Sequence, residues 1–307
     1  MDTLNLISDY EIESLGVKEE WVYDIEVKNN HNFFANDILV HNSVYMDVSP
    51  LVEKFMPNAD TDKVVDMLAK FSAEKMEPEL ERMYGVLMDY LNVTERTLAA
   101  DREIIGTPGI FVSKKRYAIR VYDSEGVRYP EPKMKIMGLD IVKSSTPAIL
   151  RDKLKECVGY MMDKTNDDLI SYIDDVKREF DTLSIEDIGM PRGVSSVSKY
   201  YENGVPVSKG VPINSKAAIT HNEMLGENDT ITPIDDGGKL VFTYLKEPNP
   251  YHSHVMGFHD GIPEAFDPKW IDRDLQFEKA FVKPLKLMLN AIDWSHEKRV
   301  SLESFFG

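Results

Sequence analysis

Residues 22–43 read VYDIEVKNNHNFFANDILVHNS, and this stretch decides how the rest of the chain is interpreted. It closes on His41, Asn42 and Ser43. An asparagine amide can attack its own backbone carbonyl, form a succinimide and cleave the chain, and a histidine beside it can protonate the leaving amine. A serine hydroxyl that follows can hold an acyl group as an ester. Taken alone, the tripeptide is typical of an ordinary polar turn.

The residues upstream of this tripeptide change its interpretation. A hydrophobic-Tyr-Asp-hydrophobic-x-Val pattern is followed by Asn-His-Asn-Phe and by a small apolar run into His-Asn, and the whole stretch resembles the C-terminal blocks of inteins. The resemblance implies that Asn42 cyclises, that His41 assists it, and that Ser43 is the first extein residue and accepts the acyl group. It also implies that His31 assists proton transfer and that Asp24 orients the first nucleophile. Taken alone, His31 could also be an ordinary histidine on a strand with its hydrogen bonds satisfied.

Residues 1–42 form a short acidic segment with nine acidic and two basic residues, a net charge of −7. Residues 21–27 and 32–40 are rich in Val, Ile, Phe and Tyr, which predicts strands. Such a short segment cannot bury a core by itself. With Met1 only 41 residues before Asn42, the resemblance implies a C-terminal split-intein piece. The N-terminal intein piece, with the first nucleophile and its assisting histidine, would come from a second gene.

The composition indicates an ordinary soluble chain. It has 307 residues, a net charge of −17 and 42% hydrophobic residues, which fits about two domains. Its one cysteine, Cys157, excludes an intrachain disulfide and fits a reducing compartment. No apolar run approaches the roughly 20 residues that span a bilayer, and the N-terminus lacks the features of a signal peptide. We therefore expect a cytoplasmic protein without a membrane partner.

Beyond Ser43 the patterns predict a strand, then helices, then two strand regions, at residues 43–48, 60–91, 96–105 and 109–122. Pro78 is expected to break or kink the helical run. In the strand that follows, Asp101 and Glu103 alternate with Arg102, so both carboxylates point to one face. Paired acids of this kind can lie near a metal, and a solvated face is the alternative.

Lys114, Lys115, Arg116 and Tyr117 are expected inside the second strand region. The window 114–155 holds 11 basic and 5 acidic residues, a local charge of +6 in an acidic chain. Because binding follows the local field, this reversal predicts a track for nucleic-acid phosphates. An exposed edge strand would look similar.

The C-terminal half is expected to be mainly helical, with Ser145 or Thr146 capping a helix that has Pro147 in its first turn. Helical patterns cover residues 148–163, 167–183 and 268–292. Residues 184–265 are rich in Gly, Pro and Asn, which predicts loops and short strands.

A second resemblance covers residues 43–307, which are similar to the C-terminal part of family B replicative DNA polymerases of the T-even phage type. It is carried by SVYMD, DRE, KKRY, the run YPEPKMKIMGLD to KSSTP, KYYENGVP, AITHN and FEKAFVKPL, in this order. The chain departs from the family between DRE and KKRY, where it is shorter. In the family's motif C, YGDTDS, two aspartates bind the catalytic metals, and Ser43 resembles the serine that ends this motif. The two Mg²⁺ ions would thus be held mainly by the partner chain, and no certain metal ligand is assigned here; Asp47 does not match one.

The second resemblance also implies DNA contacts. Lys114, Lys115, Arg116 and Tyr117 would contact the minor groove and backbone of the new duplex, and Asp101 and Glu103 would lie close to the metals. The implied phosphate contacts of the thumb are Lys143, Ser144, Lys199, Tyr200, Lys209 and Lys216. The tail residues Leu302, Phe305 and Phe306 resemble a sliding-clamp-binding peptide, although Arg299 replaces its usual glutamine. The tail could instead pack on its own thumb.

Together these patterns predict an α+β multidomain chain: a β-rich intein piece (1–42), an α/β partial palm (43–133), a mainly α-helical thumb (134–297) and a clamp-binding tail (298–307). The expected function is the C-terminal half of a split DNA polymerase, joined to its N-terminal half by trans-splicing, with primer–template DNA, dNTPs and the clamp as partners. The alternative is a non-catalytic DNA-binding or processivity subunit that does not splice. An intein-associated homing nuclease lacks support, because no segment resembles its metal motifs.

Overall fold

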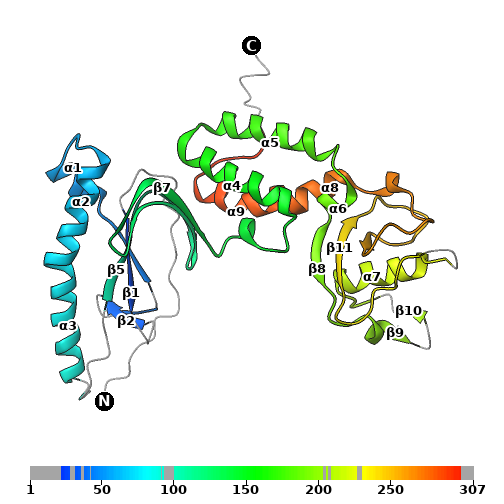
Figure 1. Ribbon diagram of the computed structural model, residues 1–307, viewed down its shortest axis with the longest axis horizontal. Helices are drawn as coiled ribbons and strands as arrows, with labels where there is room; N and C mark the ends of the chain where they lie inside the picture. The colour runs from blue at the N-terminus through cyan, green and yellow to red at the C-terminus, as the bar shows by residue number, and fades with distance from the viewer. Residues whose placement is uncertain are drawn as a thin grey trace, which may run out of the picture. The chain divides into compact units, whose positions relative to one another are not determined.

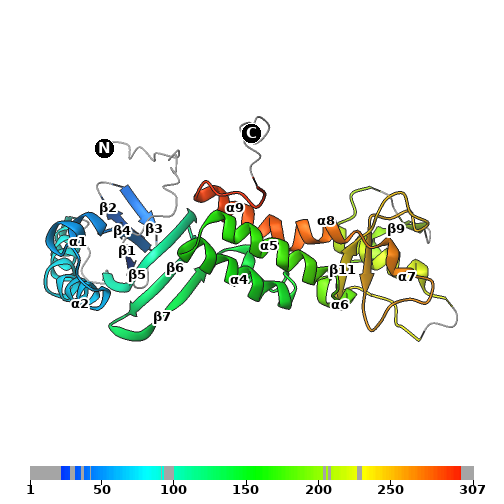
Figure 2. The same cartoon turned by 90° about the horizontal axis from the view of Figure 1, so that it is seen from above.

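The chain forms two units, residues 1–138 and 139–307 (Figures 1 and 2). The computed structural model describes residues 22–27, 32–35, 38–41, 43–90, 92, 100–202, 205–206, 209–226 and 230–298. In this part of the chain, no helix is long and apolar enough to cross a membrane. Antiparallel sheets and helices occur in both units, which confirms the mixed α and β content. The intein fold and the predicted domain limits stay predictions.

The first unit is built on a five-stranded antiparallel sheet with the order β4-β1-β5-β6-β7. Its strands are β1 (Val22–Val27), β4 (Ser43–Asp47), β5 (Ala100–Ser113), β6 (Arg116–Ser124) and β7 (Val127–Met137). A separate hairpin joins β2 (Asn32–Ala35) to β3 (Ile38–His41). Strand β1, from the acidic segment, therefore lies between two strands of the downstream chain.

Helices cover one face of this sheet: α1 (Ser49–Phe55), α2 (Thr61–Phe71), the π-helical turn η1 (Ser72–Met76) and α3 (Glu77–Tyr90) (Figure 2). Val48 and Val52 pack with Val64, Val65 and Leu68 against Ile105 of β5. Each of these side chains is buried, so this core contributes to the hydrophobic stabilisation of the unit.

Pro78 does not break the helical run, so the first of the two predicted effects, a break or a kink, is wrong. Helix α3 continues directly from η1, and Pro78 is its second residue. A proline within a helix lacks an N–H and its ring presses on the carbonyl four residues earlier. That carbonyl belongs to Glu74, inside the π turn of η1. The wider turn accommodates the ring, so the helix is locally rewound and not interrupted.

The cationic tract is also placed differently from the prediction. Lys114 and Lys115 form the turn between β5 and β6, where Ser113 pairs with Arg116. Lys115 has a φ of 63°, which is typical of a two-residue hairpin turn. The sequence prediction of one strand through the tract was wrong because β5 is long and the chain reverses at the lysines themselves.

The second unit begins with a helical layer: the short 3-10 helix η2 (Asp140–Val142), α4 (Ala148–Asp163), α5 (Asn166–Phe180), α8 (Arg273–Phe277), the π turn η5 (Glu278–Val282) and α9 (Lys283–Ala291). The helices predicted at residues 148–163 and 167–183 are confirmed as α4 and α5. The helix predicted at residues 268–292 is interrupted between η4 (Pro268–Trp270) and α8.

The predicted cap of α4 is not formed: Ser145 and Thr146 do not cap this helix, whose N-cap is Pro147. Thr146 instead donates its hydroxyl hydrogen to the Asp140 carbonyl at 3.1 Å.

The remainder of the second unit is a three-stranded sheet with α7 (Ile213–Met224) packed on it (Figure 1). The strand order is β12-β11-β8, from Val255–Phe258, Lys239–Tyr244 and Met190–Gly193. A Cβ on Gly257 would lie 2.9 Å from the Ala217 carbonyl, so glycine lets α7 approach β12 closely. Short elements also connect these parts: α6 (Ile185–Ile188), η3 (Ser198–Tyr200), β9 (Tyr201–Glu202) and β10 (Val205–Pro206).

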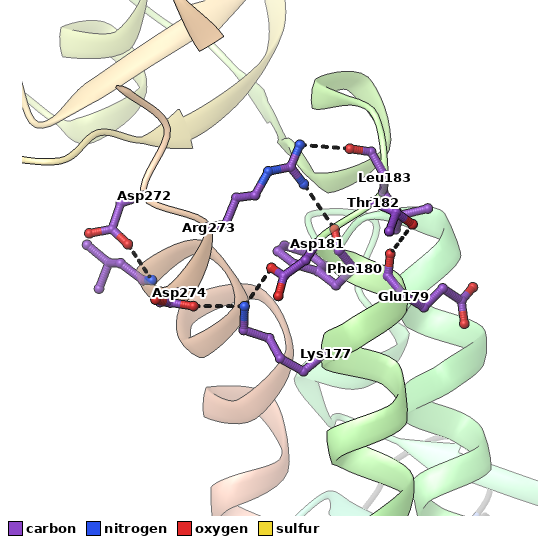
Figure 3. A network of polar contacts seen from close by, with 10 residues as sticks. Lys177, Glu179, Phe180, Asp181, Thr182, Leu183, Asp272, Arg273 and Asp274 are labelled. Atoms are coloured by element: carbon purple, nitrogen blue, oxygen red, sulfur yellow. Dashed lines mark hydrogen bonds and ion pairs between the residues drawn. The ribbon is translucent and has the colours of Figure 1, made fainter. Parts of the chain in front are cut away.

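Arg273 connects α8 to the end of α5 and the residues that follow it (Figure 3). From the first residue of α8 it donates to the carbonyl of Phe180, the last residue of α5, at 3.0 Å and to that of Leu183, three residues beyond the helix, at 2.9 Å. Lys177 bridges to Asp181 at 2.6 Å and to Asp274 at 2.8 Å. Orphan carbonyls at a helix end need such donors, so this contact fixes where the chain returns after the small sheet.

Candidate nucleic-acid interface

The turn of Lys114 and Lys115 is held by the segment that follows β7. Gly138 has a φ of 63°, and a Cβ at this position would overlap the Lys115 carbonyl oxygen. Arg116 donates from Nε to the Gly138 carbonyl at 3.2 Å. Both lysines are exposed. The backbone thus presents two cations on a turn whose conformation is fixed from behind by a glycine.

Tyr117 does not share this exposure, since it is only 6% exposed. Its ring lies 4.9 Å from that of Tyr45 on β4 and 5.7 Å from that of Phe111 on β5, centroid to centroid. Aromatic clusters of this geometry add stability beyond their buried area. The ring therefore braces the tract against the strand that begins at Ser43, and its proposed DNA contact stays a prediction.

The two acidic residues of β5 have different surroundings. Asp101 is exposed, whereas Glu103 forms an ion pair with Lys135 of β7. Between them, Arg102 forms a buried ion pair with Asp123 at 2.6 Å. A pocket of about 500 Å³ is lined in part by Asp101, Arg102 and Glu103. No group of three or more His, Cys, Asp or Glu residues within the described ranges is placed to hold a metal ion.

In the second unit, Lys143 and Ser144 are exposed on the loop after η2. Lys143 forms an ion pair with Asp140 at 2.6 Å, which is solvent-exposed and therefore weak. Arg192 of β8 donates to the Ser145 carbonyl at 2.8 Å. The loop is thus anchored to the small sheet while its polar tip stays in solvent.

Lys199 and Tyr200 follow a segment held by one carboxylate. Asp236 accepts the Ser198 N–H at 3.0 Å, the Ser198 hydroxyl at 2.5 Å and the Val197 N–H. The Ser198 hydroxyl, followed by these backbone N–H groups, lowers the pKa of Asp236. The charged form of Asp236 thereby positions the exposed Lys199.

Lys216 lies in the first turn of α7, and its Nζ is 3.0 Å from Nδ1 of His254. Burial lowers the pKa of His254, and the charge of Lys216 lowers it further. A neutral imidazole nitrogen then accepts a hydrogen from the ammonium group. Tyr200 packs on the same apolar cluster as Ala217 beside it, so the segments of Lys199 and Lys216 are brought together, and Lys209 lies exposed between them in sequence.

The splicing residues are only partly within the described chain. His31, Asn42 and the tail residues Leu302, Phe305 and Phe306 lie outside the described residues. Asp24 is placed on β1 opposite Tyr45, and Ser43 begins β4 opposite Glu26. His41 ends β3. These assignments stay predictions.

Sequence reasoning missed five residues that position the cations: Gly138, Tyr45, Arg192, Asp236 and His254. Gly138 belongs to the run YPEPKMKIMGLD, but it is more than 20 residues away from Lys114 and Lys115 in sequence. The sequence therefore did not indicate that Gly138 contacts the lysine turn. Arg192, Asp236 and His254 lie in residues 184–265, which were expected to form loops and short strands and where no periodicity marks a partner. Only the contacts across β8 and β11 and the loops around them reveal these roles.

The chain is similar to DNA-directed DNA polymerases of phages. It is 32% identical over 279 residues to that of Escherichia phage RB69 and 30% identical over 280 residues to that of Enterobacteria phage T4. Each alignment covers 86% of this chain and 31% of the relative. A DNA polymerase of Thermococcus hydrothermalis is 32% identical over 133 residues, 43% of this chain and 6% of the relative. No family model matches.

The chain is therefore homologous to phage DNA-directed DNA polymerases over most of its length, and it spans about 31% of theirs. This confirms the second resemblance at that level. The intein resemblance stays a prediction.

Proposed function

We propose that the residues after Asn42 form the DNA-gripping part of a phage replicative DNA polymerase. The observation that carries this proposal is the exposed turn of Lys114 and Lys115, fixed by Gly138, in a chain homologous to such polymerases. Two cations on a rigid turn contact phosphates of any sequence, which is what a polymerase needs from its product duplex. Lys143, Ser144, Lys199, Tyr200, Lys209 and Lys216 would add further backbone contacts. This DNA synthesis would take place in the cytoplasm of the infected host.

The chemistry of nucleotide transfer would require residues of a partner chain. Polymerases use two Mg²⁺ ions to activate the primer hydroxyl and stabilise the leaving pyrophosphate. Asp101 is exposed, and Glu103 is paired with Lys135, so the two do not form such a site by themselves. The contribution of this chain is to hold and orient duplex DNA beside a site completed by the partner. Its tail (Leu302, Phe305 and Phe306) would bind the sliding clamp.

We further propose that residues 1–42 are a split-intein piece that joins the two halves. The Asn42 amide nitrogen would attack its own carbonyl carbon, which breaks the peptide bond to Ser43 and frees the Ser43 amine. The acyl group held as an ester on the Ser43 hydroxyl would then move to that amine and form a peptide bond. His41 and His31 would assist the proton transfers, and Asp24 would orient the first nucleophile. The residues after Asn42 make up 86% of the chain, the same share that the phage relatives match.

The splicing proposal is tested by mixing the full chain with an N-terminal polymerase part that carries a matching intein piece. Mass spectrometry should show a ligated product and a released segment ending at Asn42. Asn42→Ala should abolish this release, because alanine has no amide nucleophile. Normal cleavage after position 42 in the variant would contradict the mechanism.

The polymerase proposal is tested by primer extension with Mg²⁺. The ligated product should extend primers, whereas the chain alone should bind primer–template weakly and incorporate no nucleotide. Extension by the chain alone would refute the need for a partner. A ligated product that binds DNA without extending it would favour the non-catalytic processivity subunit.

A further inference from the structure

Strand β1 is the link between β4 and the rest of the first sheet. Its residues pair with β4 on one side, from Val22 opposite Asp47 to Glu26 opposite Ser43. On the other side they pair with β5, from Val22 opposite Gly106 to Val27 opposite Ala100. Among the described strands, β4 has β1 as its only neighbour in the sheet order. Removal of residues 1–42 would therefore leave a gap between β4 and β5.

The two sides of this gap are anchored independently of β1. Strand β5 pairs with β6 on its other edge. On β4, Tyr45 packs against Phe111 at 4.9 Å between ring centroids. Met46 packs on the buried cluster of Val48, Val64 and Leu68. Adjacent strands lie about 4.8 Å apart, so the gap would be roughly 10 Å across, which is room for a single strand.

The direction of β1 matches that of a strand joined to Ser43. A strand that precedes Ser43 through a tight turn runs antiparallel to β4. In the same gap it would also run antiparallel to β5, as β1 does. A strand of the upstream polymerase part, once joined to Ser43, would thus fit the place of β1 in orientation as well as in width.

The proposed splicing function requires the residues of β1 for a second arrangement. On the proposed splicing function, residues 1–42 complete the fold of the other intein piece, because so short a segment cannot bury a core by itself. Both edges of β1, however, are occupied by β4 and β5. A strand has only two hydrogen-bonding edges, so it cannot satisfy both arrangements. Pairing of either edge of β1 with the other intein piece would withdraw β1 from this sheet and free the gap.

We propose that the gap between β4 and β5 is a docking site for one strand of the partner polymerase part, and that β1 fills this site until the intein pieces assemble. This inference rests on the proposed splicing function. Filling the site protects two strand edges that would otherwise invite aggregation. Withdrawal of β1 couples intein assembly to docking of the correct strand.

A reversible cross-link in the full chain tests the exchange. The register places Ile25 opposite Val44, so Ile25→Cys with Val44→Cys should form a disulfide that locks β1 onto β4. The native Cys157 is buried, and burial raises the pKa of its thiol, so it should not compete. The matched control is Ser124→Cys with Val127→Cys, a pair opposed on β6 and β7 away from β1.

The oxidised Ile25–Val44 variant should not splice with the N-terminal part, and reduction should restore splicing, whereas the control pair should splice in both states. Splicing at equal rates in the oxidised and reduced variant would overturn the inference. So would failure of the Ile25–Val44 pair to cross-link under conditions that close the control pair. Absence of splicing in the unmodified chain would instead refute the underlying splicing function, so the two failures are distinguishable.

Hydrogen exchange gives a second test that needs no cross-link. In the full chain carrying Asn42→Ala, which blocks release, amides of residues 43–47 and 100–106 should be protected. Addition of the N-terminal intein piece alone should expose them, and addition of the same piece fused to its polymerase part should protect them again. Protection that does not change on adding the intein piece would overturn the exchange.

Discussion

The two units hold their candidate DNA-contacting cations by different means. In the first unit, the backbone does so: the turn of Lys114 and Lys115 lies against Gly138, where no side chain fits. In the second unit, polar side chains do so: Asp236 holds the segment before Lys199, and His254 accepts from Lys216. The first arrangement is sensitive to steric change and indifferent to pH. The second depends on which side chains carry charge.

The largest expected effect is that of Gly138→Ala. The new methyl group would overlap the Lys115 carbonyl oxygen and would require a φ of 63° at an alanine. We expect the free energy of unfolding to fall by roughly 3 kcal/mol, since overpacking and backbone strain add. Chemical denaturation monitored by fluorescence measures this loss.

Gly126→Ala is the matched control for that substitution. Gly126 also has a positive φ, 82°, but nothing lies within 4 Å of a Cβ built there. Only the conformational cost of about 1 kcal/mol should remain. Equal losses at the two positions would show that the Lys115 turn is not braced by Gly138.

Arg273→Met should come next and tests the side-chain arrangement of the second unit. It leaves the carbonyls of Phe180 and Leu183 without their donor while keeping an unbranched side chain. A loss of about 2 kcal/mol is expected, because partly buried acceptors lose charge-assisted hydrogen bonds. Arg178→Met is a control, since this exposed residue forms its ion pair within α5, with Asp175, and with no other described residue. A comparable loss in the control would assign the effect to net charge.

Sequence reasoning recovered local features better than contacts between distant segments. Helix α4 is where its pattern predicts, because its apolar positions Leu150, Leu154 and Val158 repeat at helical spacing. Helix α7 was missed, because its buried residues Ala217 and Ala218 are small and give little periodic signal. Ala217 lies where β12 approaches closely at Gly257. The turn in the cationic tract was missed because lysines are not typical turn residues.

The sequence also could not assign β1 to its neighbours. The pattern of residues 22–27 indicates a strand, and it is one. Alternation of apolar residues specifies a face and not a partner, so the pairing with β4 and β5 came only from the structure. The same limit applies to Tyr45, whose contact with Tyr117 joins segments far apart in sequence.

Replacing the two turn lysines should affect DNA binding and leave stability unchanged. Lys114→Ala with Lys115→Ala removes two exposed cations. A plot of the logarithm of the association constant against the logarithm of salt concentration has a negative slope. Its steepness should decrease by about 2, because each phosphate contact that is lost releases about one counterion fewer. Lys75→Ala on η1 is the control for an exposed lysine elsewhere. Fluorescence anisotropy with duplex DNA of two unrelated sequences should give the same change for both.

The smallest expected effect concerns His254 and pH. Burial and the neighbouring Lys216 lower the pKa of His254 in the folded state, and Glu247 opposes this only as the weakest of the three influences. The unfolded chain therefore takes up the proton near its ordinary pKa of about 6.5, while the folded chain takes it up only at lower pH. Since the unfolded state binds more protons in this window, stability should fall as the pH drops below about 6.5 and level off once the folded state is also protonated.

His254→Gln isolates this contribution, because its amide oxygen can still accept from Lys216 and does not titrate in this range. The free energy of unfolding of the wild type, measured by urea denaturation between about pH 7.5 and 5, should decline more steeply than that of the variant. Protonation would also place a second cation against Lys216 Nζ, 3.0 Å away in the neutral pair, and displace it from its position. The wild type should then show a change in its DNA-binding salt slope over the same interval, whereas the variant should not. Parallel pH profiles for the two proteins would show that His254 does not position Lys216, and the second unit would then differ from the first less than the contacts indicate.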